Sequence, residues 1–409
     1  MKHKIYFIST MSCSPWGGSE VLWSEAALSL LIKGQSVSAS VHGWQDRPEP
    51  LVRLARAGVS VEDRMFSRMR FRSKATRTLV RPILRRLSRS FLGVWLSRKQ
   101  PDLVCISLGS MLEDISLISV CAARNIPYVI VLHMVAEFAW PQDEVADRII
   151  DLFSKAKCVF FVSQGNRTLF EAQIGMKLCN AEIAWNPFNV RRDAAPPWPV
   201  TSNSVKFACI GRLNPEAKGQ DLLLRVLARE TWRGRDVSVS FFGKGEMLGG
   251  LRRLAQQLGL EDRVNFYGHV PDIEAVWSTH HALVLPSRYE GLPLVVVEAM
   301  HCGRPVIVTD VAGNIEVVED GVTGYVAEAA TIRHLSAAME RAWSDRGRWE
   351  SVGRRAAEAI RKLVPEDPAT EFASKLLSLT AGGGTPGGDS VVRVARHQGS
   401  ANPHLVQSR

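Results

Sequence analysis

The chain has 409 residues, of which 46% are hydrophobic and 22% charged, and its formal net charge is +10. This length exceeds what one hydrophobic core normally holds, so we expect two domains and additional segments. No apolar stretch reaches the roughly 20 residues that a helix needs to cross a bilayer, which argues against a membrane-embedded protein.

The seven cysteines show no spacing typical of metal ligands, and most of them lie in apolar contexts. Free buried thiols of this kind are typical of a reducing compartment. The apolar segment before Ser9 is too short for a signal peptide. We therefore expect a cytoplasmic protein.

The first predicted strand, Lys4 to Thr10, ends in a turn, and Gly17 and Gly18 then open a helix that runs to about Lys33. Glycines at such a turn permit a ligand to approach the backbone closely, because they lack side chains. A plain strand-to-helix turn is the alternative, since paired glycines are common in turns.

A strongly basic segment runs from Arg64 to Lys99, with 12 Lys and Arg residues and no Asp or Glu. Since the whole chain carries +10, the remainder carries 10 − 12 = −2. Pro82 is placed to start a helix in this segment. The apolar side of that helix would carry Ile83, Leu84, Leu87, Phe91, Val94 and Trp95, and the other side would carry Arg85, Arg86 and Arg89.

A basic amphipathic helix is typical of an element that binds an anionic membrane surface. A domain helix that packs its apolar side on the sheet explains the same pattern equally well. Nucleic-acid binding is disfavoured, because only one basic segment carries aromatic residues and no fold for that purpose is recognisable.

The apolar run from Tyr128 to Leu132 predicts a buried strand, and His133 follows it directly. Ligands bind open α/β sheets at the carboxyl ends of the strands, so His133 is a candidate functional residue. A structurally satisfied histidine is an equally good interpretation.

Residues 191–203 are rich in proline and separate two regions in which apolar strands alternate with helices. Such strands are typical of parallel sheets covered on both faces. We predict an α/β protein with an N-terminal domain at 1–190, a linker at 191–203 and a C-terminal domain at 204–365. A helix at 366–379 is expected to cross back to the N-terminal domain, and the glycine-rich, polar residues 380–409 are expected to form a disordered tail.

The second half opens with a strand, Val205 to Gly211, after which Arg212 and Lys218 precede a helix predicted from Leu222. A cation near a helix start opposes the helix dipole, which favours negative charge there. Lys218 therefore makes better sense if an anion occupies the site. Two solvated surface cations are the simpler alternative.

Two further strands end in turns that are weaker candidates. One turn contains Gly243 and Gly245, whose missing side chains would let the backbone approach phosphate groups. The other contains His269 and Val270, whose backbone could contact a ligand. By itself, His269 is more simply explained as a surface residue.

The most informative stretch is Glu290-Gly-Leu-Pro-Leu-Val-Val-Val-Glu298, which follows an apolar strand at 282–286 and enters a helix at Leu294. A helix would separate the two carboxylates by roughly 12 Å along its axis, so they should contact different parts of one ligand. Backbone N–H groups at Gly291, Leu292 and Leu294 lie where a helix start can bind an anion or hydroxyl groups. A surface Glu and a helix-capping Glu are the alternative.

The spacing of seven residues between Glu290 and Glu298 resembles the donor-binding signature of the retaining glycosyltransferases of family 4. The other motifs follow in the order typical of that family, most specifically from Gly211 to Gly324. The resemblance spans about Ile5 to Leu377. It implies the GT-B architecture, in which two Rossmann-like domains face each other across the active site.

By this resemblance, Glu290 and the amides after it hold the hydroxyls of the transferred sugar, and Glu298 holds the ribose of a nucleotide sugar. Arg212 and Lys218 stabilise the leaving nucleoside diphosphate. In the absence of any Asp-x-Asp sequence, these cations and helix N-termini would neutralise the diphosphate, so no metal ion or other cofactor is expected.

The resemblance also places the Gly17–Gly18 loop under the donor phosphates and the backbone near His269 and Val270 around the nucleotide base. A histidine at the position of His133 lies near the acceptor in many members. The segment from Trp185 to Asn189 departs from the usual family sequence, so no role is carried over to it.

We therefore expect a retaining glycosyltransferase that moves a sugar from a nucleotide sugar to a saccharide or lipid-linked saccharide acceptor. The lipid link, a role in cell-envelope or exopolysaccharide synthesis, and a location at the inner face of the plasma membrane are inferred only from the basic segment 64–99. A catalytically silent nucleotide-sugar-binding protein and a glycoside hydrolase remain as alternatives.

Overall fold

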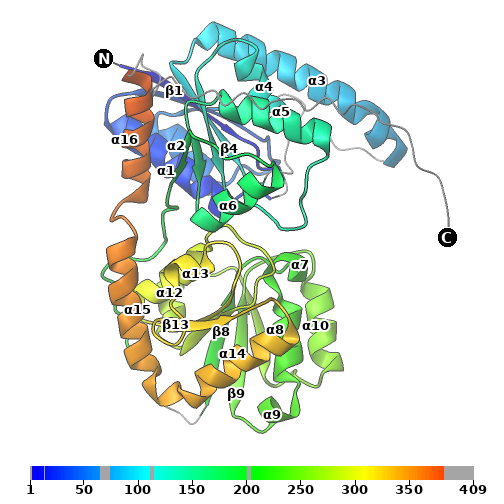
Figure 1. Ribbon diagram of the computed structural model, residues 1–409, viewed down its shortest axis with the longest axis vertical. Helices are drawn as coiled ribbons and strands as arrows, with labels where there is room; N and C mark the ends of the chain where they lie inside the picture. The colour runs from blue at the N-terminus through cyan, green and yellow to red at the C-terminus, as the bar shows by residue number, and fades with distance from the viewer. Residues whose placement is uncertain (1, 13, 65–73, 111–114, 200–203, 382–409) are drawn as a thin grey trace, which may run out of the picture.

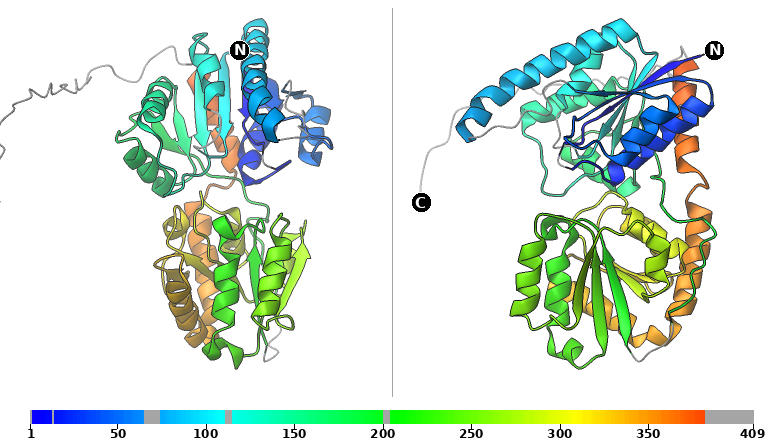
Figure 2. Two further views of the ribbon diagram at one scale, coloured as in Figure 1. Left: turned by 90° about the vertical axis from the view of Figure 1, so that its right-hand side faces the viewer. Right: turned by 180° about the vertical axis from the view of Figure 1, so that it is seen from behind.

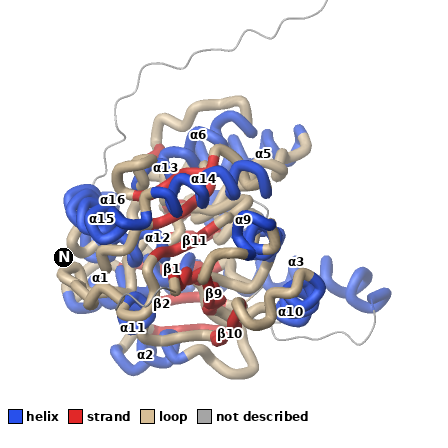
Figure 3. Tube along the Cα trace, turned by 90° about the horizontal axis from the view of Figure 1, so that it is seen from below, coloured by secondary structure: helices blue, strands red, loops and turns tan. Residues whose placement is uncertain are grey.

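The computed structural model describes residues 2–12, 14–64, 74–110, 115–199 and 204–381. Its two parallel sheets are each covered by helices on both faces, as Figure 1 shows from the side and Figure 3 from below. Parallel strands buried on both faces must be apolar throughout, which explains the near-continuous hydrophobic runs in the sequence. The predicted α/β fold with two Rossmann-like domains is confirmed.

The N-terminal sheet has the strand order β3-β2-β1-β4-β5-β6-β7. Its strands are β1 (Lys4–Ser9), β2 (Ser36–Val41), β3 (Ser60–Asp63), β4 (Leu103–Leu108), β5 (Tyr128–Leu132), β6 (Val159–Phe161) and β7 (Ala181–Ile183). The helices packed around it are α1 (Gly18–Ile32), α2 (Glu49–Ala57), α3 (Lys74–Lys99), α4 (Ser116–Ala122), α5 (Asp143–Ser154), α6 (Gln164–Gln173) and α16 (Pro368–Ala381).

The C-terminal sheet has the order β10-β9-β8-β11-β12-β13. Its strands are β8 (Val205–Ile210), β9 (Val237–Phe242), β10 (Val264–Gly268), β11 (Ala282–Leu285), β12 (Val306–Thr309) and β13 (Gly324–Ala327). Its helices are α7 (Pro215–Lys218), α8 (Gln220–Leu227), α9 (Glu230–Arg233), α10 (Leu248–Gln257), α11 (Ile273–Trp277), α12 (Leu294–His301), α13 (Asn314–Val317), α14 (Ile332–Ser344), a short 3-10 helix (Arg346–Arg348) and α15 (Trp349–Leu363).

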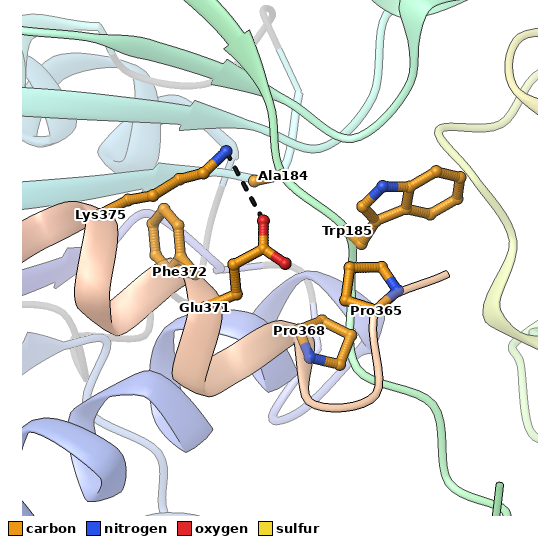
Figure 4. Close-up of a pocket in the computed structure, with 7 residues that line it drawn as sticks. All are labelled: Ala184, Trp185, Pro365, Pro368, Glu371, Phe372 and Lys375. Atoms are coloured by element: carbon orange, nitrogen blue, oxygen red, sulfur yellow. Dashed lines mark ion pairs between the residues drawn. The ribbon is translucent and has the colours of Figure 1, made fainter. Parts of the chain in front are cut away.

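The chain passes between the domains twice along one side of the molecule (Figures 1 and 2). The first passage follows β7, and the second joins α15 to α16, whose Phe372 and Leu376 are buried in the N-terminal core. Figure 4 shows that Trp185 from the first passage and Pro365 and Pro368 from the second line one small cavity. Helix α16 is described to Ala381, so it includes the first two residues of the predicted tail; residues 382–409 lie outside the described residues.

Helix α3 differs from its prediction. It begins at Lys74, so Pro82 lies within the helix and does not start it. Two of its apolar residues, Leu92 and Leu96, are buried against the N-terminal core, and Trp95 packs beside them. A second apolar row remains on the surface, with exposed fractions of 59% for Ile83, 41% for Leu87, 44% for Phe91 and 47% for Val94. Residues 65–73 of the basic segment lie outside the described residues.

No helix in the described ranges combines the length and the apolarity needed to cross a bilayer.

A carboxylate from the C-terminal domain binds the first turn of a helix in the N-terminal domain. Glu316 accepts hydrogen bonds from the backbone N–H groups of Gln164 (3.0 Å) and Gly165 (2.6 Å), at the start of α6. Gly165 must be glycine here, because a Cβ would lie 2.7 Å from the carbonyl oxygen of Ala312. Negative charge at a helix N-terminus is favourable, so this contact holds the two domains together.

We predict that Glu316→Ala shifts the protein towards an open arrangement of its domains. A hydrogen bond to a charged group contributes about 1.5–3 kcal/mol, which corresponds to a shift of roughly tenfold or more. The interdomain distance, measured by electron paramagnetic resonance with one spin label on each domain, should lengthen or broaden. Glu340→Ala is the matched control, because Glu340 pairs with Arg235 (2.7 Å) inside the C-terminal domain. Identical distance distributions for wild type and Glu316→Ala would show that the contact does not hold the domains.

Candidate active site between the domains

The candidate residues lie just beyond the carboxyl ends of strands in both sheets. Strands β1 and β5 lead to the Gly17–Gly18 loop and His133, while β8, β9, β10 and β11 lead to the candidates of the C-terminal domain. Ligands bind parallel α/β sheets at this edge. The structure therefore places both groups of candidates where the two sheets face each other.

The glycine loop of the N-terminal domain approaches the C-terminal domain directly. A Cβ on Gly17 would lie 3.7 Å from Nη2 of Arg212, and a Cβ on Gly18 would lie 3.5 Å from Cδ1 of Leu294. The predicted diphosphate cation, Arg212, thus lies beside the loop that was predicted to run under the phosphates.

Gly291 makes the closest approach to the N-terminal domain. A Cβ at this position would collide with the carbonyl oxygen of His133. The carbonyl of Gly291 also accepts hydrogen bonds from Gly313 N (3.0 Å) and Ser163 Oγ (3.4 Å). Gly291 is therefore required for the domains to meet, independently of any ligand.

Lys218 and Glu290 form an ion pair, with Nζ and Oε1 2.5 Å apart. Ser287 Oγ donates a second hydrogen bond to the same carboxylate oxygen, at 2.7 Å. The side chain of Glu290 is 8% exposed and that of Lys218 is 22% exposed. The sequence predicts that Lys218 faces an external anion near the start of a helix. Instead it ends the short helix α7, two residues before α8, and the anion that faces it is Glu290.

Two residues that the sequence analysis missed fix the turn that carries Glu290. Arg288 forms a bidentate pair with Asp221 of α8, at 2.7 and 2.9 Å. The backbone N–H of Arg288 also bonds the carbonyl of Ala217 (2.7 Å) in α7. The turn is therefore held against the segment that contains Lys218, and this keeps Lys218 and Glu290 close enough to pair.

Glu298 lies in α12, is 4% exposed, and bonds to the first interdomain passage. Its Oε1 accepts hydrogen bonds from the backbone N (3.0 Å) and the side-chain Nδ2 (2.8 Å) of Asn189. Burial raises the pKa of Glu298, and the bonds from Asn189 oppose that shift. No hydrogen bond to Oε2 occurs within the described part of the chain, so this oxygen is available to a hydroxyl group. Asn189 lies in the segment to which the family pattern assigned no role.

The two candidate glycines after β9, Gly243 and Gly245, are explained by packing within the protein. A Cβ on Gly243 would collide with the carbonyl oxygen of Gly211, and a Cβ on Gly245 would collide with that of Leu213. The glycines let two neighbouring strand-end loops pack backbone against backbone. Their presence is therefore no sign of a phosphate, although they lie directly beside the segment that leads to Arg212.

The predicted base-binding loop lies beside these glycines. The N–H of Gly243 bonds the carbonyl of Gly268 (2.6 Å), the residue before His269. His269 is exposed, and Val270 is partly buried against the C-terminal core. Leu292 is buried, whereas Leu294 is partly exposed at the first turn of α12. The binding of a nucleotide base or a sugar by the backbone of these residues stays a prediction.

His133 is 6% exposed, and its Nε2 lies 3.1 Å from Ser107 Oγ. Burial lowers its pKa to about 4, an effect that the nearby side chain of Asn186 opposes. The imidazole is therefore neutral at pH 7 and cannot contribute positive charge. It can exchange a hydrogen bond with a ligand hydroxyl, or it can simply complete the domain interface at Gly291.

Within the described residues, no group of three or more His, Cys, Asp or Glu side chains is arranged to hold a metal ion.

Known proteins resemble this chain in part of its sequence and in its fold. Residues 191–361 match the family model described as glycosyl transferases group 1. An alpha-D-kanosaminyltransferase of Streptomyces kanamyceticus is 36% identical over 138 residues, which is 33% of this chain and 36% of the relative. A GDP-mannose-dependent alpha-(1-6)-phosphatidylinositol monomannoside mannosyltransferase of Mycolicibacterium smegmatis is 30% identical over 219 residues, which is 48% of this chain and 56% of the relative. The matched regions thus span only about a third to just over half of these relatives.

Solved structures match over nearly the whole chain. Anabaena HepE in complex with UDP and glucose superposes with a TM-score of 0.71 at 19% identity, covering 92% of this chain and 99% of HepE. The apo form of the lipopolysaccharide outer core galactosyltransferase WaaB superposes with a TM-score of 0.66 at 19% identity, covering 92% and 99% of the two chains. At this identity the likeness establishes the fold alone. The fold is therefore that of these GT-B structures, and residues 191–361 match the group 1 glycosyltransferase family.

Proposed function

We propose that this protein transfers a sugar from a nucleotide-sugar donor to a saccharide acceptor. The observation that carries the proposal is the ion pair of Lys218 and Glu290, which lies at the same edge of the C-terminal sheet as Arg212, the cation that faces Gly17 of the N-terminal domain. These groups bring two cations and one carboxylate together at a single interface. A nucleotide sugar presents the complementary diphosphate and hydroxyl groups.

The cations would act on charge that develops during the reaction. As the bond from the anomeric carbon to the diphosphate breaks, negative charge grows on the leaving oxygen, and Arg212 and Lys218 would stabilise it. Lys218 must then leave Glu290, so that the carboxylate becomes free to accept hydrogen bonds from sugar hydroxyls. Binding of the donor therefore also releases Glu290 from Lys218.

Glu298 is proposed to hold the ribose through the oxygen that Asn189 leaves open. We further propose that the reaction retains the anomeric configuration and needs no metal ion, because Arg212 and Lys218 supply the charge that a cation would otherwise provide. The hydrolase and the silent binding protein gain no support from the family match.

The acceptor is proposed to be a saccharide, lipid-linked in the setting of envelope or exopolysaccharide synthesis. By its name, the mycobacterial relative acts on a phosphatidylinositol mannoside, which is a glycolipid. Helix α3 lies along the end of the N-terminal domain that is remote from the C-terminal domain, and it combines basic residues with an exposed apolar row (Figure 1). We propose that this row rests on an anionic membrane surface.

The function is tested by screening UDP-sugars and GDP-sugars for thermal stabilisation, and then by measuring nucleoside diphosphate release with and without saccharide acceptors. We expect release that depends on the acceptor and persists in a strong chelator. Arg212→Ala should lower turnover on the order of 10²-fold, because one charge-stabilising group is lost. Arg225→Ala, which removes an exposed cation of α8, is the matched control and should leave turnover unchanged.

Wild-type turnover in Arg212→Ala would remove the diphosphate assignment. Release that is independent of any acceptor would indicate hydrolysis, and stabilisation without release would indicate a binding protein. Activity that a chelator abolishes and magnesium restores would contradict the metal-free proposal.

Substitutions of the two glutamates should weaken the binding of different ligands. Glu298→Gln should weaken the binding of a free nucleoside diphosphate, whereas Glu290→Gln should mainly weaken the binding of the intact nucleotide sugar. A charged hydrogen bond contributes roughly 1.5–3 kcal/mol, which titration calorimetry resolves. If both variants bind the nucleoside diphosphate as wild type does, the ribose assignment is wrong.

Membrane binding is tested on the exposed row of α3. Wild type should sediment with anionic vesicles but not with zwitterionic ones, and salt should weaken the binding because it screens surface charges. Leu87→Asn combined with Phe91→Asn should weaken sedimentation, since both side chains are exposed and would insert at the headgroup boundary. Ile32→Asn, at an 86% exposed position on α1, is the control. Undiminished sedimentation of the double variant would make α3 a purely structural helix.

A further inference from the structure

The connection between β5 and α5 holds two aromatic side chains in an exposed position. Phe138 is 67% exposed and Trp140 is 64% exposed. No other Phe, Tyr or Trp side chain in the described residues is as exposed; Tyr267 follows at 59%. An aromatic side chain can bury about 150–250 Å², so leaving two of them in water forgoes substantial stabilisation. An exposed pair of this kind indicates a surface that another molecule covers.

The loop is fixed, so its rings are not exposed through lack of structure. Asn166 Oδ1 accepts a hydrogen bond from the backbone N–H of Val135 (3.0 Å), and Gln173 Nε2 donates one to the carbonyl of Ala136 (2.7 Å). Both amide side chains are buried on α6. Val135, Ala136 and Ala139 are themselves buried, so small residues anchor the loop while Phe138 and Trp140 point away from the core.

The loop borders the proposed donor site. It starts at His133, whose carbonyl is in contact with Gly291. The Phe138 ring packs edge-on against the ring of Tyr289 from the other domain, with 5.3 Å between centroids and an interplanar angle of 72°. Tyr289 directly precedes Glu290, the residue proposed to hold the transferred sugar. In Figure 1 the connection descends from the N-terminal domain towards α7 before it rises to α5.

The charge around the rings favours one kind of occupant. Glu137 lies between the buried anchors and the rings, and α5 begins with Asp143 and Glu144; all three are exposed. These carboxylates would repel an anionic lipid headgroup but can accept hydrogen bonds from hydroxyl groups. A pyranose ring offers both an apolar C–H face for an aromatic ring and hydroxyls at its edge.

We propose that Phe138 and Trp140 form the platform that binds a neutral sugar unit of the acceptor saccharide. This inference rests on the proposed function, which it deepens by assigning the acceptor site to the 134–142 loop. The Phe138 ring, held against Tyr289, places the bound sugar next to the turn that carries Glu290. The exposed Glu137 accepts hydrogen bonds from its hydroxyls.

The experiment uses an array of neutral oligosaccharides probed with the full-length protein in the presence of UDP or GDP. The variant Phe138→Leu/Trp140→Leu keeps apolar side chains but removes the rings, and it should lower array binding on the order of tenfold, as the loss of an aromatic anchor does. Phe138→Tyr/Trp140→Phe keeps two rings and should retain binding. Ile32→Ala, which shortens an exposed apolar side chain on α1, is the control and should retain array binding.

Thermal unfolding and calorimetry with the nucleoside diphosphate separate a binding role from a structural one. Because the rings are about two-thirds exposed, the leucine variant should unfold at the wild-type temperature and bind the nucleotide as wild type does. In a transfer assay, its KM for the acceptor should rise more than its kcat falls. If the array shows binding that depends on the rings but no sugar transfer occurs, the platform proposal is supported and the proposed enzymatic function is contradicted.

Three results would overturn the platform. The first is equal array binding, or equal acceptor KM, for wild type and the leucine variant. The second is a wild type that binds no oligosaccharide on the array while it binds nucleotide. The third is a loss of anionic-vesicle sedimentation in the leucine variant with array binding unchanged, which would assign the rings to lipid.

Discussion

The contact between the turn at Gly291 and the carbonyl of His133 determines how the two domains meet. No side chain fits between these two segments, so the carboxyl edges of the two sheets can approach until backbone lies against backbone. The close approach of the domains also brings the other candidate groups together. The Gly17–Gly18 loop reaches Arg212 and Leu294, Glu316 reaches the first turn of α6, and Phe138 reaches Tyr289. Without this close contact between Gly291 and His133, residues from the two domains could not form one site.

Within that interface, the Lys218–Glu290 pair leaves neither of its two charges without a partner. A partly buried cation and a buried carboxylate would each be costly alone. Paired, and with Ser287 on the same oxygen, they satisfy one another until a ligand supplies both an anion and hydroxyl donors. Phe138 reaches the same turn through Tyr289, the residue before Glu290, so the proposed acceptor platform lies next to this pair.

Much of this could be predicted from the sequence, because the signals are local. Apolar runs predict strands that are buried on both faces, and the glycines and charges after them mark the carboxyl edge of a sheet. That reasoning predicted the α/β fold and strand ends such as Leu132 before His133. It failed where an interaction joins distant segments: Asn189 binds Glu298 across 109 positions, and Glu316 binds Gly165 across 151. It also placed the start of α3 at Pro82, whereas the helix begins at Lys74, and it left open whether the apolar side packs on the domain or stays at the surface, because both occur on this helix.

The central claim is that a nucleotide-sugar donor binds between the domains by separating Lys218 from Glu290. Crystal structures of the protein with UDP and with GDP, together with the corresponding nucleotide sugars, test it most directly. We expect a diphosphate in contact with Lys218 Nζ and Arg212, with Glu290 released from the lysine and turned to the sugar hydroxyls. A nucleotide bound elsewhere, or bound while the Lys218–Glu290 pair stays intact, would contradict it.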